Sequence, residues 1–218
     1  VRVTYDESLA LALPRTGGRA HLIIGKDAMV RSDAVRAGLK IRQMAALTHS
    51  DGGTGMHGVF LVPANSAIRT LKDLAGKRVA LGPPEDEETH AAAKRALAEA
   101  GLAGDVDFFD AGSVDAAALS MSDGESAAAV VSAFLPVLLE GCGKLDKGSS
   151  RIIGRTPEVP FIRVYATDAL TEADGSKITS ALRTVAQSPE LLAALESSAG
   201  FAVAGGGADS EWADRRGP

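Results

Sequence analysis

Cysteine and aromatic residues are scarce in this chain of 218 residues. Cys142 is the single cysteine, so no disulfide can form within the chain and the redox compartment cannot be read from it. No apolar run approaches the roughly 20 residues that a membrane-spanning helix requires, so we expect no membrane insertion. Val1 leads directly into an expected strand, so we expect no signal peptide here and interpret the chain as mature, trimmed or a fragment.

A basic face is also missing. The chain has 23 Lys and Arg against 28 Asp and Glu, a net charge of −5. The basic residues are scattered, and neutralising phosphates requires a concentrated basic surface, so we expect no nucleic-acid partner. The hydrophobic fraction of 45% is sufficient for a core without disulfides or metals.

Short apolar runs alternate with alanine-rich helical stretches along the chain. We expect strands at residues 1–5, 21–24, 41–47, 58–62, 78–81, 106–109, 127–132, 151–154 and 161–166. We expect helices at residues 7–13, 32–37, 66–74, 87–100, 114–121, 135–140, 177–186 and 189–197. This alternation predicts parallel sheets and the α/β class.

The central part of the chain contains enough strands and helices for a lobe of its own. We therefore expect residues 58–158 to form lobe 2, and residues 1–57 plus 159–203 to form a discontinuous lobe 1. Residues 204–218, rich in glycine and polar residues, are interpreted as a linker or tail. An inserted lobe with two chain crossings is the architecture of a hinge-closing binding protein.

The segment Ile68–Ala80, IRTLKDLAGKRVA, resembles a motif of type 2 periplasmic solute-binding proteins. It is most similar to the phosphate/phosphite/phosphonate-binding branch found with ABC transporters. Three further stretches agree with this family, at residues 17–25, 123–131 and 151–157, and the resemblance covers about residues 1–201. It implies a two-lobed type 2 periplasmic-binding-protein fold, here without the family's first strand–helix unit.

The resemblance also implies a function. A small ligand would be clamped between two lobes in a periplasmic or other extracytoplasmic compartment, and an ABC transporter permease would be the partner. We expect no enzyme activity and no cofactor. Two alternatives stay open: an enzyme on the same fold, and a sensory or recruitment module fused to a β-propeller, because Trp212–Pro218 resembles the start of PQQ-like propeller domains.

The loop after the expected strand at 78–81 departs from the family. The family has Ser and Thr there, which bind phosphonate oxygens, whereas residues 85–88 of this chain are all acidic. At about 4 Å and an effective dielectric constant of about 20, each like-charge pair costs roughly 4 kcal/mol, and less where water screens it. The loop therefore argues against phosphonate and favours a cationic ligand or a metal, with capping of the following helix as the alternative.

Polar residues near strand ends are the candidate ligand-binding residues, because ligands of open α/β folds bind at that edge of the sheet. The candidates are Tyr5, Asp6, Lys26, Asp27, Glu87, Glu88, Thr89, His90, Ser113 and Ser132. Helix capping is the alternative role for Asp6 and Ser113, and a surface turn for Lys26 and Asp27. Residues 53–58 match GxGxxG but lead into a strand, so we assign no nucleotide site, and we assign no catalytic residue and no metal site.

Overall fold

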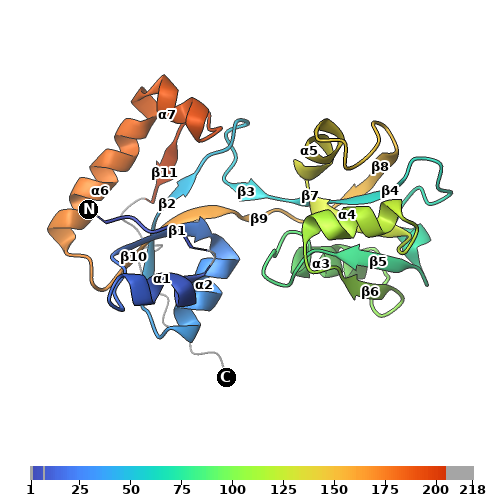
Figure 1. Cartoon of the computed structure of the whole chain (residues 1–218), viewed down its shortest axis with the longest axis horizontal. Helices are drawn as coiled ribbons and strands as arrows, with labels where there is room; N and C mark the ends of the chain where they lie inside the picture. Colours follow the sequence, from blue (N-terminus) through green and yellow to red (C-terminus); the bar gives the residue numbers. More distant parts are fainter. Residues whose placement is uncertain (1, 7, 205–218) are drawn as a thin grey trace. The chain divides into compact units, whose positions relative to one another are not determined.

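The structure is a computed structural model that describes residues 2–6 and 8–204. The described residues form two compact units: unit 1 contains those up to Gly55 and those from Pro160 onward, and unit 2 is Met56–Val159. The chain passes between the units twice, through β3 (Gly55–Met56) and β9 (Val159–Pro160), which pair with each other (Figure 1). The propeller-like segment at 212–218 lies outside the described residues.

Unit 2 is built on a five-stranded sheet with the order β6-β5-β7-β4-β8. Its elements are β4 (Gly58–Pro63), the 3-10 helix η1 (Leu71–Leu74), β5 (Arg78–Leu81), α3 (Ala91–Glu99), β6 (Asp107–Asp110), α4 (Val114–Ser122), β7 (Ala128–Ser132), α5 (Leu135–Gly141) and β8 (Ser150–Arg155). Strand β5 runs parallel to β6 and β7, whereas β4 runs antiparallel to β7 and β8. The α/β class expected from the sequence is confirmed.

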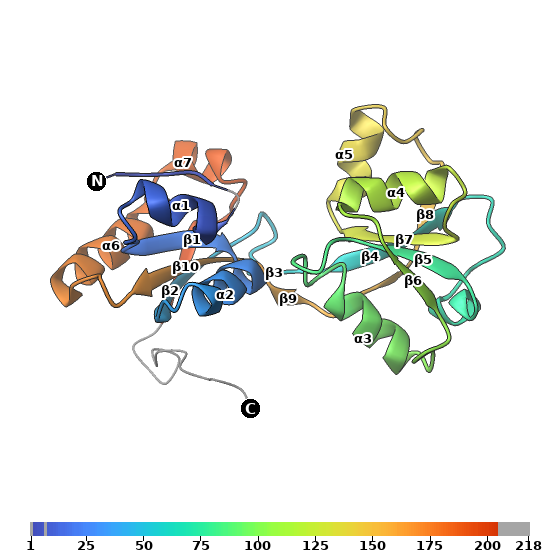
Figure 2. The same ribbon diagram turned by 60° about the horizontal axis from the view of Figure 1, so that its bottom comes forward.

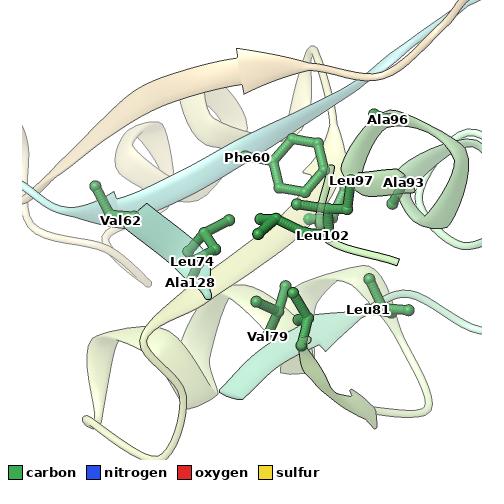
Figure 3. Packing of buried hydrophobic residues seen from close by; sticks show 12 residues of the cluster. Phe60, Val62, Leu74, Val79, Leu81, Ala93, Ala96, Leu97, Leu102 and Ala128 are labelled. Atoms are coloured by element: carbon green, nitrogen blue, oxygen red, sulfur yellow. The ribbon is translucent and has the colours of Figure 1, made fainter. Parts of the chain in front are cut away.

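The sheet of unit 2 is covered by helices on both faces. Alternate residues of a strand point to opposite faces, so Phe60 and Val62 pack on the side of α3 while Val59 and Leu61 pack on the side of α4 and α5. Figure 2 shows these helices on their two sides of the sheet, and Figure 3 shows Phe60 close to Leu97 of α3. All residues of β7 are buried, as they must be in a strand that is covered on both faces.

Unit 1 is built on a four-stranded sheet with the order β1-β10-β2-β11. Its elements are α1 (Leu9–Arg15), β1 (Leu22–Lys26), α2 (Asp27–Arg36), β2 (Ile41–Leu47), β10 (Ile162–Thr167), α6 (Glu172–Thr184), the 3-10 helix η2 (Val185–Gln187), α7 (Pro189–Ala194) and β11 (Phe201–Val203). Every strand pair in this sheet is antiparallel, so the prediction of parallel sheets is wrong for unit 1. The error arises because β10, which is remote in sequence, lies between β1 and β2.

Strand β10 provides the centre of the core of unit 1. Tyr165 packs with residues of α1 and α2 on one face of the sheet. Val164 and Ala166 pack with Leu182 of α6 on the other face. Unit 1, like unit 2, therefore has helices on both faces of its sheet.

Several expected elements differ from the structure, and α2 and α6 each begin five residues earlier than expected. The described residues 2–5 form no strand. The helix expected at 66–74 is reduced to η1, because the Asp73 carboxylate accepts the N–H groups of Arg69 and Thr70, both at 2.9 Å, in place of helical carbonyls. The helix expected from residue 87 begins at Ala91, because residues 83–90 form turns.

Among the described residues, no helix combines the length and the apolar character that crossing a membrane requires.

Candidate functional site

The carboxyl edge of the sheet in unit 2 gathers polar residues from distant parts of the chain. Strands β5, β6 and β7 end at this edge, and the antiparallel strand β4 begins there, with Gly58 opposite Ser132. Thr156, which follows β8, reaches the same place and accepts the N–H of Gly58 at 2.7 Å. Ligands of open α/β folds bind at such an edge, so it is the first candidate site.

The loop of residues 83–90 packs tightly onto this edge. A Cβ atom at Gly58 would lie 2.5 Å from the carbonyl oxygen of Glu88, and one at Gly82 would lie 2.2 Å from Oγ1 of Thr89. Only glycine allows the loop to approach so closely. Thr89 is fully buried, and its hydroxyl donates to the carbonyl of Asp86 within the same loop.

Glu88 and Ser132 form a buried polar pair. The Ser132 hydroxyl donates to Oε1 of Glu88 at 3.0 Å, and the two residues are only 2% and 3% exposed, Ser132 being the lower. They come from β7 and from the loop after β5, 44 positions apart in the chain. The sequence predicted both residues as separate candidates, and the structure brings them together.

His90 and Glu87 lie nearer the surface of the same loop. Nδ1 of His90 is 3.1 Å from the carbonyl oxygen of Gly82, and Nε2 is 2.7 Å from Nζ of Lys94. The Glu87 carboxylate is 3.5 Å from the guanidinium of Arg95. Because α3 has no acidic residue in its first turn, the alternative that the acidic loop caps this helix is wrong.

Ser113 has a structural role at the start of α4. Its hydroxyl accepts the N–H of Ala116 at 3.1 Å, which confirms the helix-capping alternative.

In unit 1, Asp27 lies at the end of β1 and begins α2. Its N–H donates to the carbonyl of Phe161 at 2.7 Å, and its buried carboxylate accepts the hydroxyl of Tyr165. Burial, and then this hydrogen bond to Asp27, raise the pKa of Tyr165 above its usual value. The surface-turn alternative for Asp27 is therefore wrong, since its side chain ties α2 to β10.

Lys26 borders a small aromatic cluster at the same end of β1. Its Nζ lies 5.9 Å from the centre of the Phe161 ring, which stacks on His49 with 5.3 Å between ring centres. Among the described residues, Nε2 of His49 is buried without a hydrogen-bond partner. The sequence analysis did not single out Phe161 or His49 as ligand-binding residues. The signal was present, because Phe161 is the first residue of the expected strand at 161–166 and His49 follows two positions after the expected strand at 41–47.

Tyr5 and Asp6 do not follow a strand. Tyr5 is 95% exposed. Asp6 pairs with Arg15 at 2.9 Å, and Ser8 caps α1, so the capping alternative for Asp6 is wrong. Within the described part of the chain, no three potential metal ligands are placed to hold a common ion.

A family profile described as "ABC transporter, phosphonate, periplasmic substrate-binding protein" matches residues 28–212. The chain belongs to this family. The polar residues at the carboxyl edge of the unit 2 sheet and at the end of β1 thus belong to a solute-binding protein of the phosphonate-binding family. Among the curated proteins, no sequence matches the chain significantly.

Solved structures share the fold of this solute-binding protein. XAC2383 from Xanthomonas citri bound to ATP has a TM-score of 0.69 at 17% identity, over 87% of this chain and 74% of that one. PhnD1 from Prochlorococcus marinus in complex with methylphosphonate has a TM-score of 0.66 at 17% identity, over 90% and 77%. The aliphatic sulphonate-binding protein SsuA from Escherichia coli has a TM-score of 0.59 at 20% identity, over 85% and 63%.

Proposed function

We propose that this chain captures a small solute outside the cytoplasm and presents it to the permease of an ABC transporter. The family supports this role, and one structural observation carries it. The buried pair Glu88–Ser132 lies at the carboxyl edge of unit 2, where an open α/β sheet binds its ligand. No observation on the described residues favours an enzyme or a fused propeller module.

We propose a shorter list of solute-contacting residues. We propose Glu88, Ser132 and His90 in unit 2, and Lys26 with Phe161 in unit 1. Glu87, Thr89, Asp27 and Ser113 become positioning residues, because each already contacts another part of its own unit. Tyr5 and Asp6 receive no support, because no strand precedes them.

The crossings β3 and β9 are the proposed hinge. Family membership implies closure on the solute, and rotation about two short connecting segments would allow it. A bound solute should then lower the radius of gyration measured by small-angle X-ray scattering.

A thermal-unfolding screen against small oxyanions, amines and divalent cations tests the proposal, together with native mass spectrometry of any co-purifying solute. A ligand that binds only the folded state raises the free energy of unfolding, by about 2.7 kcal/mol at a hundredfold excess over Kd. Methylphosphonate is one probe, since PhnD1 was solved in complex with it. A screen without any stabilising solute, and with no co-purified solute, would contradict the function.

A further inference from the structure

We propose that His90 and Lys94 form a proton-sensitive contact at the unit 2 edge. The contact opens when His90 is protonated, and the edge then favours an anionic group of the solute. This inference rests on the proposed solute-binding function, to which it adds a regulation by pH. Histidine is the side chain whose charge ordinarily changes between pH 5 and 8, so the contact would respond to the pH of the surroundings.

The neighbours of the His90 ring indicate which of its nitrogen atoms carries the hydrogen. Nδ1 lies 3.1 Å from the carbonyl oxygen of Gly82 and 3.5 Å from Oδ1 of Asp110, and a carbonyl and an ionised carboxylate can only accept. Nε2 lies 2.7 Å from Nζ of Lys94, and a charged ammonium can only donate. In this arrangement His90 is therefore neutral, with its hydrogen on Nδ1 and the Nε2 lone pair directed to Lys94.

Protonation of His90 turns this attraction into a repulsion. The added hydrogen would lie on Nε2, which is 2.7 Å from the Lys94 ammonium, and two like charges at that distance repel each other. The imidazole is the less mobile partner, because its side chain is only 12% exposed and Gly82 holds Nδ1. Lys94 is exposed, so it is the side chain that moves away.

The other charged groups around His90 favour the imidazolium. Asp110, at the end of β6, faces Nδ1, as does the carbonyl at the end of β5. Residues 85–88 of the same loop are acidic. Lys94, on the first turn of α3, is the cation in direct contact with the ring. Release of Lys94 therefore removes the repulsion and leaves the acidic groups to stabilise the protonated ring.

Lys94 also has a second contact on the same side. Its Nζ lies 5.4 Å from the centre of the Phe108 ring in β6, and the ammonium can keep this cation–π contact after it leaves Nε2. Its departure uncovers a charged N–H donor on His90. Such donors bind oxyanions through charge-assisted hydrogen bonds, so acidification should strengthen the binding of an anionic group at this edge.

Nitrogen NMR of the imidazole rings in the full chain tests the contact without any solute. At pH 8 the His90 ring should carry its hydrogen on Nδ1. In Lys94→Gln its titration midpoint should rise by about half a pH unit or more, because a like charge has been removed. Lys177→Gln, the same change at an exposed lysine of α6 in unit 1, is the control and should move the midpoint by less than about 0.1 pH unit. A hydrogen on Nε2 in the neutral ring, or equal midpoints in wild type and Lys94→Gln, would overturn the proposal.

Calorimetric titration with methanesulfonate tests the consequence for the solute. This probe keeps a single negative charge from pH 5 to pH 8, so a change in affinity comes from the protein. Wild type should bind it about fivefold or more tightly at pH 5.5 than at pH 8. His90→Gln cannot be protonated, so its two affinities should differ less than about twofold. His21→Gln, the same change at an exposed histidine of unit 1, should keep the wild-type difference.

Three results would contradict the link between this contact and the solute: equal wild-type affinities at the two pH values, a pH dependence that persists in His90→Gln, and no binding of methanesulfonate at pH 5.5. If His90→Gln does not fold, Lys94→Gln replaces it, and the pH at which its affinity changes should rise together with its imidazole midpoint. The solute-binding function fails separately, when the wider screen and the co-purified material give no solute.

Discussion

The backbone N–H of Gly58 donates to the hydroxyl of Thr156 over 2.7 Å, although the two residues are 98 positions apart. The bond joins the start of β4 to the segment after β8, at the edge where Glu88 and Ser132 meet. Both partners are buried, so the N–H has no access to water if the hydroxyl is removed.

Replacing Thr156 by Val keeps the side-chain shape and removes the acceptor. The buried N–H of Gly58 is then unsatisfied, and the free energy of unfolding should fall by about 1–3 kcal/mol. Denaturant unfolding measures the change. Thr184→Val, which removes an exposed hydroxyl at the end of α6, should change it by less than about 0.5 kcal/mol. Similar losses in the two variants would assign no special role to the bond.

Gly58→Ala should displace the loop that carries Glu88. The new Cβ atom would lie 2.5 Å from a backbone oxygen, which cannot yield as a flexible side chain could. Such overpacking typically destabilises by about 1–3 kcal/mol. Thermal unfolding measures the change in stability. Gly141→Ala is the control, at the end of α5, where a Cβ atom meets nothing within 4 Å; it should leave the stability unchanged or raise it. If Gly58→Ala is equally harmless, the fold does not depend on the close approach of the Glu88 carbonyl to Gly58.

Tyr165 should make the stability of unit 1 sensitive to alkaline pH. Its pKa is raised by burial and by the hydrogen bond to Asp27, so the neutral phenol stabilises the folded state at any pH below the unfolded-state value of about 10. As pH rises above about 10, only the unfolded state ionises at first, and the free energy of unfolding falls by up to about 1.4 kcal/mol per pH unit.

Tyr165→Phe should remove this slope above pH 10 while lowering the free energy of unfolding at neutral pH by about 1.5–3 kcal/mol, because the lost hydrogen bond is to a buried carboxylate. Urea unfolding across a pH series measures both effects. Tyr5→Phe, at a position 95% exposed, is the control for the second tyrosine and should leave the wild-type slope in place. A slope that survives Tyr165→Phe would contradict the assignment.

Phe161→Ala should weaken solute binding by about 2–5-fold, with the solute found in the screen as the titrant. The variant removes the ring beside Lys26 and His49, and an exposed cation–π contact contributes about 0.5–1 kcal/mol. Leu191→Ala, which shortens an exposed apolar side chain on α7, is the control and should not change the affinity. Unchanged affinity in Phe161→Ala would remove this ring from the proposed site.

The sequence predicted local structure well where one physical effect dominated. Strands β2 and β5 have the expected bounds, because each is a largely apolar run that a polar residue or a glycine follows. The helix expected at 66–74 failed because Asp73 competes for backbone N–H groups. The antiparallel sheet of unit 1 could not be predicted from local pattern, since its central strand arrives after an intervening unit.

The same limit applies to the candidate site. The sequence placed Glu88 after one strand and Ser132 at the end of another, but their 3.0 Å contact depends on which strands are neighbours in the sheet. The burial that distinguishes Glu88 from Glu85 likewise depends on the glycines at positions 58 and 82, from two other segments. Tertiary packing therefore determines which acidic residue of the loop is buried at the candidate site.

The position of β10 in the unit 1 sheet has a consequence for biosynthesis. β10 lies between β1 and β2, and more than a hundred residues separate β2 from β10 in the chain. The two early strands emerge from the ribosome without a neighbour to pair with. Met56–Val159 holds all its own strands, so it can complete its sheet during translation while the first segment waits. Until β10 is synthesised, β1 and β2 would expose unpaired strand edges. A chaperone would be of most use to this protein during that interval.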